Sequence, residues 1–83
     1  MEFRFNGINV YYNGELSIKN LEIRISYQTT LIFIGGSHIF SAYFVGLDSE
    51  TIAELLKDCF EEYGIETSEE EVKKASEWIK AHL

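Results

Sequence analysis

The sequence predicts an α+β fold: an N-terminal antiparallel β-meander of five to six short strands, followed by two amphipathic helices packed on one face. Residues 1–47 alternate apolar and polar side chains between turn signals, whereas residues 48–83 show helical periodicity. The charge changes at the same boundary. The first segment carries three acidic and three basic residues, and the second carries eleven acidic and four basic residues. This asymmetry indicates that the two halves present different surfaces to partners.

The length of 83 residues leaves room for a single domain, residues 1–83, with the β-meander at 1–47 and an acidic helical hairpin at 48–83. Hydrophobic residues make up 46% of the chain, so we expect a packed core. The single cysteine, Cys59, cannot form an internal disulfide, and the N-terminus shows no basic, apolar leader. We therefore expect a soluble cytoplasmic protein without a membrane segment.

Turn signals divide the early strands. Asn6-Gly7 is typical of a two-residue type I′ hairpin turn, which would bring four apolar side chains to one face, namely Phe3, Phe5, Ile8 and Val10. Tyr12-Asn13-Gly14 predicts a three-residue loop with a glycine bulge, after which Leu16 and Ile18 would face Val10 and Ile8. The apolar alternation changes parity again before Leu21, which predicts a turn or bulge at Lys19-Asn20.

The later strands are more apolar. After turns at 28–30 and at Gly35-Gly36, the segments 31–34 and 39–45 are apolar on both faces, which is typical of strands covered on two sides. The helices can cover one face only. Something else must cover the other face, and a second copy of the chain is the candidate. The candidate dimer-interface residues are Ile32, Ile34, Ile39 and Tyr43, or whichever set points away from the helices. Tyr11, Tyr12 and Tyr43 could also be exposed on the outer face, although simple cross-strand packing explains them equally well.

The first helix follows Asp48 or Ser49, either of which can cap it, with Glu50 near its positive end. An apolar stripe then recurs at helical spacing and comprises Ile52, Leu55, Leu56, Cys59, Phe60 and Tyr63. Gly64 is typical of a left-handed helix C-cap.

Ser68 and Glu71 form a capping-box pattern at the start of the second helix. Its buried stripe is expected to contain Val72, Ala75 and Ile79. The pairs Glu69–Lys73 and Glu70–Lys74 have the favourable i,i+4 spacing.

No residue pattern indicates catalysis. His38 and His82 are far apart in sequence, and Cys59 lies in an apolar stripe with no basic neighbour to activate it. Gly35-Gly36-Ser37 matches no phosphate-binding motif and reads as a hairpin turn. Glu61 and Glu62 are adjacent on a helix and therefore diverge, so they do not form an acid–base pair. We expect no enzyme activity, no metal and no cofactor.

The strongest functional candidate is an acidic stripe on the first helix. Glu50, Glu54, Asp58 and Glu61 recur at intervals of four, four and three residues. The candidate partner-binding residues are these four together with the adjacent Glu62. Like charges at this spacing cost helix stability, and only Lys57 lies nearby to relieve them. The stripe could be an ordinary solvated surface that maintains solubility, or it could bind a basic partner.

The sequence therefore supports two functions of different kinds. The first is a small acidic protein-binding module, such as an inhibitor that occupies a basic, nucleic-acid-binding site on a partner; phage anti-defence proteins of the anti-CRISPR type are comparable in size and charge only. Direct nucleic-acid binding is disfavoured because phosphates require a basic surface. The alternative is a structural or assembly protein that acts through a sheet-mediated homodimer or within a larger complex.

Overall fold

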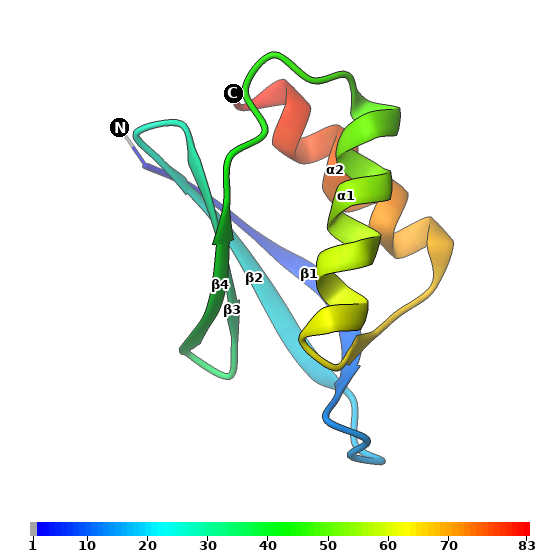
Figure 1. Ribbon diagram of the computed structural model, residues 1–83. Helices are drawn as coiled ribbons and strands as arrows, with labels where there is room; N and C mark the ends of the chain where they lie inside the picture. The colour runs from blue at the N-terminus through cyan, green and yellow to red at the C-terminus, as the bar shows by residue number, and fades with distance from the viewer. Residues whose placement is uncertain (1) are drawn as a thin grey trace.

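In the computed structural model, which describes residues 2–83, four strands precede two helices (Figure 1), and a short fifth strand follows the first helix along the chain. The elements in chain order are β1 (Glu2–Tyr12), β2 (Lys19–Ser26), β3 (Thr29–Ile34), β4 (Ser37–Ala42), α1 (Ser49–Glu62), β5 (Ile65–Glu66) and α2 (Glu69–Ala81).

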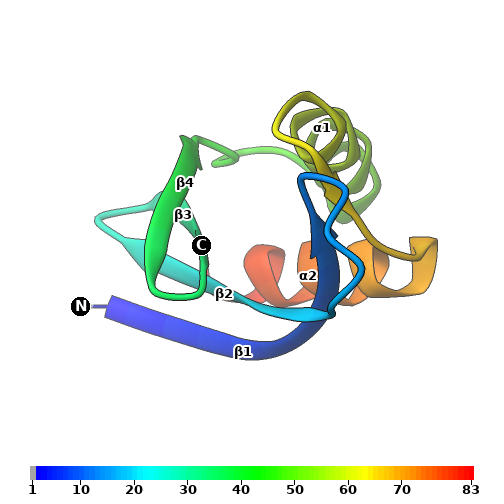
Figure 2. The same cartoon turned by 90° about the horizontal axis from the view of Figure 1, so that it is seen from below.

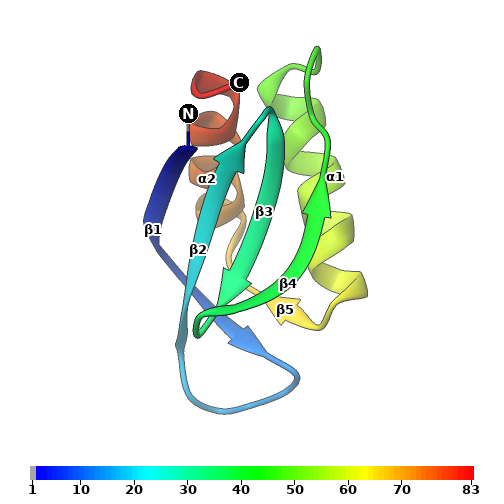
Figure 3. The ribbon, with the colours of Figure 1, turned by 90° about the vertical axis from the view of Figure 1, so that its left-hand side faces the viewer.

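The strands form one antiparallel sheet in the order β4-β3-β2-β1-β5. The first four strands are a meander because each pairs with the next along the chain. The sheet is curved, and both helices lie on its concave side (Figures 2 and 3). This arrangement confirms the predicted α+β class and the order of its parts. The predicted helical hairpin contains one additional element, since β5 pairs with the end of β1 at Tyr11 and Tyr12.

The Asn6-Gly7 pair lies inside β1, so the hairpin predicted there is wrong. β1 stays paired with β2 on both sides of Gly7, which is the extra residue of a β-bulge. Gly7 has φ of 135°, a backbone conformation that residues other than glycine rarely adopt. The extra residue shifts the alternation of β1 by one position after Gly7. Phe3 and Phe5 before the bulge and Ile8 and Val10 after it therefore share the side that faces the helices, as expected.

The turn after β1 forms at the second Asn-Gly pair. Asn13 and Gly14 have φ of 53° and 72°, and the Glu15 N–H donates a hydrogen bond of 3.1 Å to the Tyr12 carbonyl. The connection is longer than predicted, however, because β2 begins only at Lys19.

Two apolar residues in this connection do not join the core. Leu16 and Ile18 are 95% and 59% exposed, so the prediction that they face β1 is wrong. The predicted irregularity at Lys19-Asn20 is also wrong, because both residues pair regularly with β1. The change of parity marks the start of β2, and the alternation Leu21, Ile23, Ile25 is then buried as expected.

The β2–β3 turn consists of Tyr27 and Gln28, whose φ values of 50° and 66° are those of a type I′ turn. The sequence prediction placed this turn slightly later, at 28–30, because tyrosine is not a typical turn residue. The β3–β4 turn at Gly35-Gly36 is confirmed, with φ of 58° and 81°.

Helix α1 begins at the predicted cap. The Asp48 carboxylate accepts a hydrogen bond of 2.8 Å from the Thr51 N–H, which holds the pKa of Asp48 below its usual value. The helix buries Ile52, Leu56 and Phe60. The other members of the predicted stripe lie at its margin and are partly exposed, namely Leu55, Cys59 and Tyr63. Gly64, with φ of 72°, ends the helix as predicted.

Helix α2 is capped by Ser68, whose hydroxyl accepts a hydrogen bond of 3.2 Å from the Glu71 N–H. It buries Val72, Ala75, Ser76 and Ile79. The ion pairs differ from those predicted: Lys74 lies 3.4 Å from Glu71, and Glu69 lies 3.6 Å from Lys57 of α1. The latter pair connects the two helices.

Aromatic contacts join each helix to a different part of the sheet. On the α1 side, the Tyr63 ring stacks on Phe40 of β4 with 4.9 Å between centroids. On the α2 side, Trp78 stacks on Phe5 of β1 at 5.3 Å and on His82 at 4.3 Å. α1 is therefore positioned beside β4 and α2 beside β1.

Candidate protein-binding surfaces

Five acidic side chains cover the exposed side of α1, opposite the buried Ile52–Leu56–Phe60 side. All five are exposed, and we refer to them together as the acidic face: Glu50, Glu54, Asp58, Glu61 and Glu62. The structure thus brings together every residue that the sequence predicted for a partner-binding stripe. Successive turns place like charges at i,i+4 spacing three times along this face.

The basic residue nearest to the acidic face is directed away from it. Lys57 belongs to α1, but its ammonium nitrogen lies 3.6 Å from Glu69 Oε1 on α2. A groove runs between the two helices on that side, lined by Ser49, Glu50, Ala53, Glu54, Glu69, Lys73, Ser76 and Glu77. The acidic face therefore borders a mixed-charge groove on one side and, on the other, the partly exposed apolar side chains of Leu55 and Tyr63.

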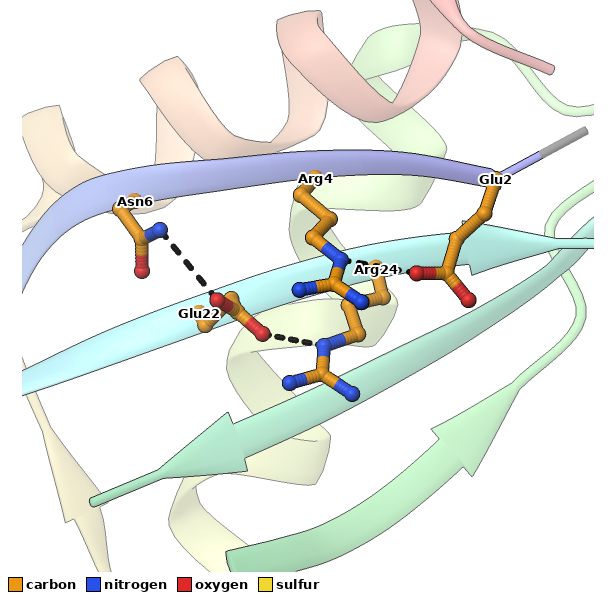
Figure 4. A network of polar contacts seen from close by, with 5 residues as sticks. All are labelled: Glu2, Arg4, Asn6, Glu22 and Arg24. Atoms are coloured by element: carbon orange, nitrogen blue, oxygen red, sulfur yellow. Dashed lines mark hydrogen bonds and ion pairs between the residues drawn. The ribbon is translucent and has the colours of Figure 1, made fainter. Parts of the chain in front are cut away.

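The sheet surface opposite the helices carries balanced charges (Figure 4). The Arg4 Nε atom donates to Glu2 at 2.8 Å, and the Asn6 amide donates to Glu22 at 3.3 Å. Arg24 also donates to Glu22. This hydrogen bond from Arg24 is the main reason that the pKa of Glu22 lies below its usual value. The charges here are paired with one another, in contrast to the acidic face.

An aromatic row continues from this network toward β4, and the sequence did not reveal it. The Arg24 guanidinium carbon lies 4.0 Å from the Phe33 ring centroid, and the Phe33 and His38 rings are 5.4 Å apart. His38 Nε2 is 2.9 Å from the Ser41 hydroxyl. His38 and Ser41 share a face because Ile39 is the extra residue of a bulge in β4. No turn residue marks this bulge, so alternation alone could not locate it.

The predicted dimer interface is not a single exposed surface. Ile32 and Ile34 are 0% and 6% exposed and lie in the core beneath the helices, so the expectation that they face a second copy is wrong. Ile39 packs partly against the core, whereas Tyr43 is 64% exposed. The side chains that alternate with the buried isoleucines on the outer side of β3 are Leu31 and Phe33, both half-buried.

The remaining candidates for chemistry are dispersed. Burial raises the pKa of the Cys59 thiol, with a further contribution from the nearby carboxylates of Glu62 and Asp58, so the thiol is not activated. In residues 2–83, no three His, Cys, Asp or Glu side chains are grouped as a metal site would require. Neither helix in the described part of the chain is both long and apolar enough to cross a membrane.

No protein-family model, curated protein or solved structure matches the chain.

Proposed function

We propose that this protein is a non-enzymatic binding module whose acidic face occupies a basic, nucleic-acid-binding site on a partner protein. The observation that carries the proposal is the clustering of five exposed carboxylates on α1, where the one lysine of the helix pairs with α2 instead. A solvated helix that served solubility alone would gain stability from interspersed lysines.

The spacing of these charges supports a nucleic-acid-binding site as the target. At a rise of about 1.5 Å per residue, Glu50 and Glu62 lie roughly 18 Å apart along the axis. The acidic face therefore carries roughly one charge per 4.5 Å, compared with about one phosphate per 3.4 Å along each strand of B-DNA. A surface that binds phosphates through Lys and Arg can accept carboxylates at similar density, because charge-assisted hydrogen bonds suit both anions.

Charge reversal tests the proposal. Wild-type protein and the Glu50→Lys/Glu54→Lys variant are immobilised, incubated with lysate of the source cells, and compared for the basic proteins they retain. A Glu15→Lys/Glu66→Lys variant is the matched control, since both of these residues are exposed, lie outside α1 and change the net charge equally. We expect the control to retain the partner and the α1 variant to lose it. The recovered partner should then release a labelled DNA or RNA when wild-type protein is added.

Two results would contradict the proposal. Equal retention by the α1 variant would show that the acidic face is not the binding surface. A partner that binds through the acidic face yet holds its nucleic acid undisturbed would show that the target is a different basic surface.

A further inference from the structure

Strand β4 is an open edge of the sheet. It is the terminal strand in the order β4-β3-β2-β1-β5, and within residues 2–83 no strand pairs with its outer side. The two-residue turn at Gly35-Gly36 makes the closing pair, Ile34–Ser37, a hydrogen-bonded pair, and hydrogen-bonded and non-hydrogen-bonded pairs alternate from there. The pairs that contain His38 and Ser41 are of the non-hydrogen-bonded kind. Consequently the backbone N–H and C=O groups of His38 and Ser41 point away from β3, toward the position of an additional strand.

The edge lacks the charges that usually protect such strands. From Ile25 to Leu47 the sequence contains no Asp, Glu, Lys or Arg, and the chain contains no proline. Natural edge strands are commonly blocked by lysine, proline or a bulge that twists the strand away. β4 has only the bulge at Ile39, which lies between the two open backbone positions. The strand therefore remains available for main-chain pairing.

The side of α1 beside this edge is apolar with an acidic border. Tyr63 stacks on Phe40 of β4, and Cys59 and Leu55 lie one and two turns earlier on the same side of the helix. Leu55 and Tyr63 are each 41% exposed. Asp58 and Glu62 follow on the neighbouring, exposed side of the helix. An added strand would thus meet partly exposed apolar side chains and, farther out, two carboxylates.

We infer that β4 is extended by a strand of the partner protein, an extended segment in which the alternate side chains that face α1 are Lys or Arg, with their aliphatic stems along Leu55 and Tyr63 and their charged ends near Asp58 and Glu62. This inference rests on the proposed function, because Asp58 and Glu62 of the acidic face supply the attraction for the basic side chains. The main-chain pairing would give affinity, and the charge alternation would give specificity. The inference thus identifies the partner's contact element as a strand rather than a helix or a loop.

Charge argues against a second copy of this chain as the occupant. Symmetric pairing of β4 with β4 would place the α1 helices of the two copies on the same side of the extended sheet and next to each other. Asp58 and Glu62 of each copy would then face the same carboxylates of the other, and each chain has a net charge of −7. A basic strand has no such penalty.

The test uses a capped octapeptide in which lysine alternates with valine and threonine, titrated into the ¹⁵N-labelled full-length protein. Two variants of the protein are compared, Ser41→Pro and Ser41→Ala. Both remove the hydroxyl that contacts His38, but only proline removes the outward N–H. We expect the peptide Kd to rise by up to about tenfold in Ser41→Pro relative to Ser41→Ala, as loss of one main-chain hydrogen bond implies. In the wild type, hydrogen exchange at the His38 and Ser41 amides should slow when the peptide binds.

A variant of the peptide keeps the test independent of protein folding. N-methylation of the alternate peptide amides that face β4 preserves every lysine but blocks strand pairing, so binding should weaken at least as much as in Ser41→Pro. Unaltered binding of this peptide, or shifts confined to α1, would overturn the inference while leaving the proposed function in place. Absence of any binding would also overturn the inference about β4. The charge-reversal experiment would still test the proposed function independently. A dimer of the wild-type protein at low salt in sedimentation, abolished by Ser41→Pro, would show that a second copy occupies the edge instead.

Discussion

Asp58 has the most unfavourable electrostatic surroundings on α1, and replacing it should stabilise the protein. Its neighbours at helical contact distance include three carboxylates, at i−4, i+3 and i+4, and no basic residue; they are Glu54, Glu61 and Glu62. Each like-charge pair at such spacing costs about 0.2–0.5 kcal/mol. Asp58→Asn, which removes three repulsions, should therefore raise the free energy of unfolding by about 1 kcal/mol.

Asp58→Lys should gain roughly twice as much, because it converts the same three repulsions into attractions. The last turn of α1 also contains no basic residue, so a lysine near this end interacts favourably with the helix dipole. For a domain of this size, each kcal/mol corresponds to a Tm increase of roughly 4–8 °C. The gain should be largest at low ionic strength, since the Debye length falls from about 30 Å at 0.01 M salt to about 3 Å at 1 M.

Thermal unfolding followed by circular dichroism at 10 mM and 1 M NaCl measures this effect in the wild type and both variants. The reasoning fails if the lysine variant is no more stable than the asparagine variant, or if 1 M salt leaves their difference unchanged. If Asp58→Lys is more stable and also loses its partner, misfolding cannot explain the loss. The chain would then be shown to keep this carboxylate at the expense of its own stability.

Three further predictions concern the sheet. Gly7→Ala should destabilise the protein by about 1–3 kcal/mol in urea unfolding, because an added Cβ meets nothing within 4 Å and the whole cost is the φ of 135°; a neutral effect would mean that the bulge relaxes. The double replacement Tyr27→Asn/Gln28→Gly should stabilise by about 1 kcal/mol, since both residues adopt positive φ in a type I′ turn that favours Asn-Gly; a lower Tm would contradict this. Glu22 has a pKa below its ordinary value of 4.5 because Arg24 donates to it, so its contribution to stability is present above that pH and is lost as the pH falls through the lower, folded-state pKa. Acid titration of Glu22→Gln should lack this component, and a curve parallel to that of the wild type would show that the pair contributes nothing.

The helices could be predicted from sequence because several local signals agree in each of them. The cap at Asp48, the stripe of Ile52, Leu56 and Phe60, and the stop at Gly64 all indicate the same boundaries. The acidic face followed directly, since helical periodicity fixes which side of α1 is exposed. The helix boundaries and the exposed side of α1 therefore depend little on tertiary contacts.

The strands were less predictable because a glycine can serve either a turn or a bulge. Asn6-Gly7 and Asn13-Gly14 have the same sequence, yet the first lies within β1 and only the second is a turn. Cross-strand pairing decides between them, and pairing is not a local property. For the same reason, the tyrosine at position 27 gave no indication of the turn that it forms.

The outward face of β3 could not be assigned because apolar residues occur at every position from 31 to 34. The phase of the alternation depends on which partner each residue meets in β2 and β4. The structure buries Ile32 and Ile34 and turns Phe33 toward Arg24 and His38. A one-residue difference in register thus exchanges the core for the surface.

The stacking of Trp78 against Phe5 and His82 gives the protein an internal optical reporter. The chain has a single tryptophan, and its ring joins the end of α2 to β1, whereas the acidic face belongs to α1 and borders β4. Indole emission should therefore follow whether α2 stays seated on the sheet, and it should remain nearly constant when a ligand occupies the opposite end of the fold. The same sample can thus distinguish a variant that has lost its partner from one that has lost its structure, without any label being introduced.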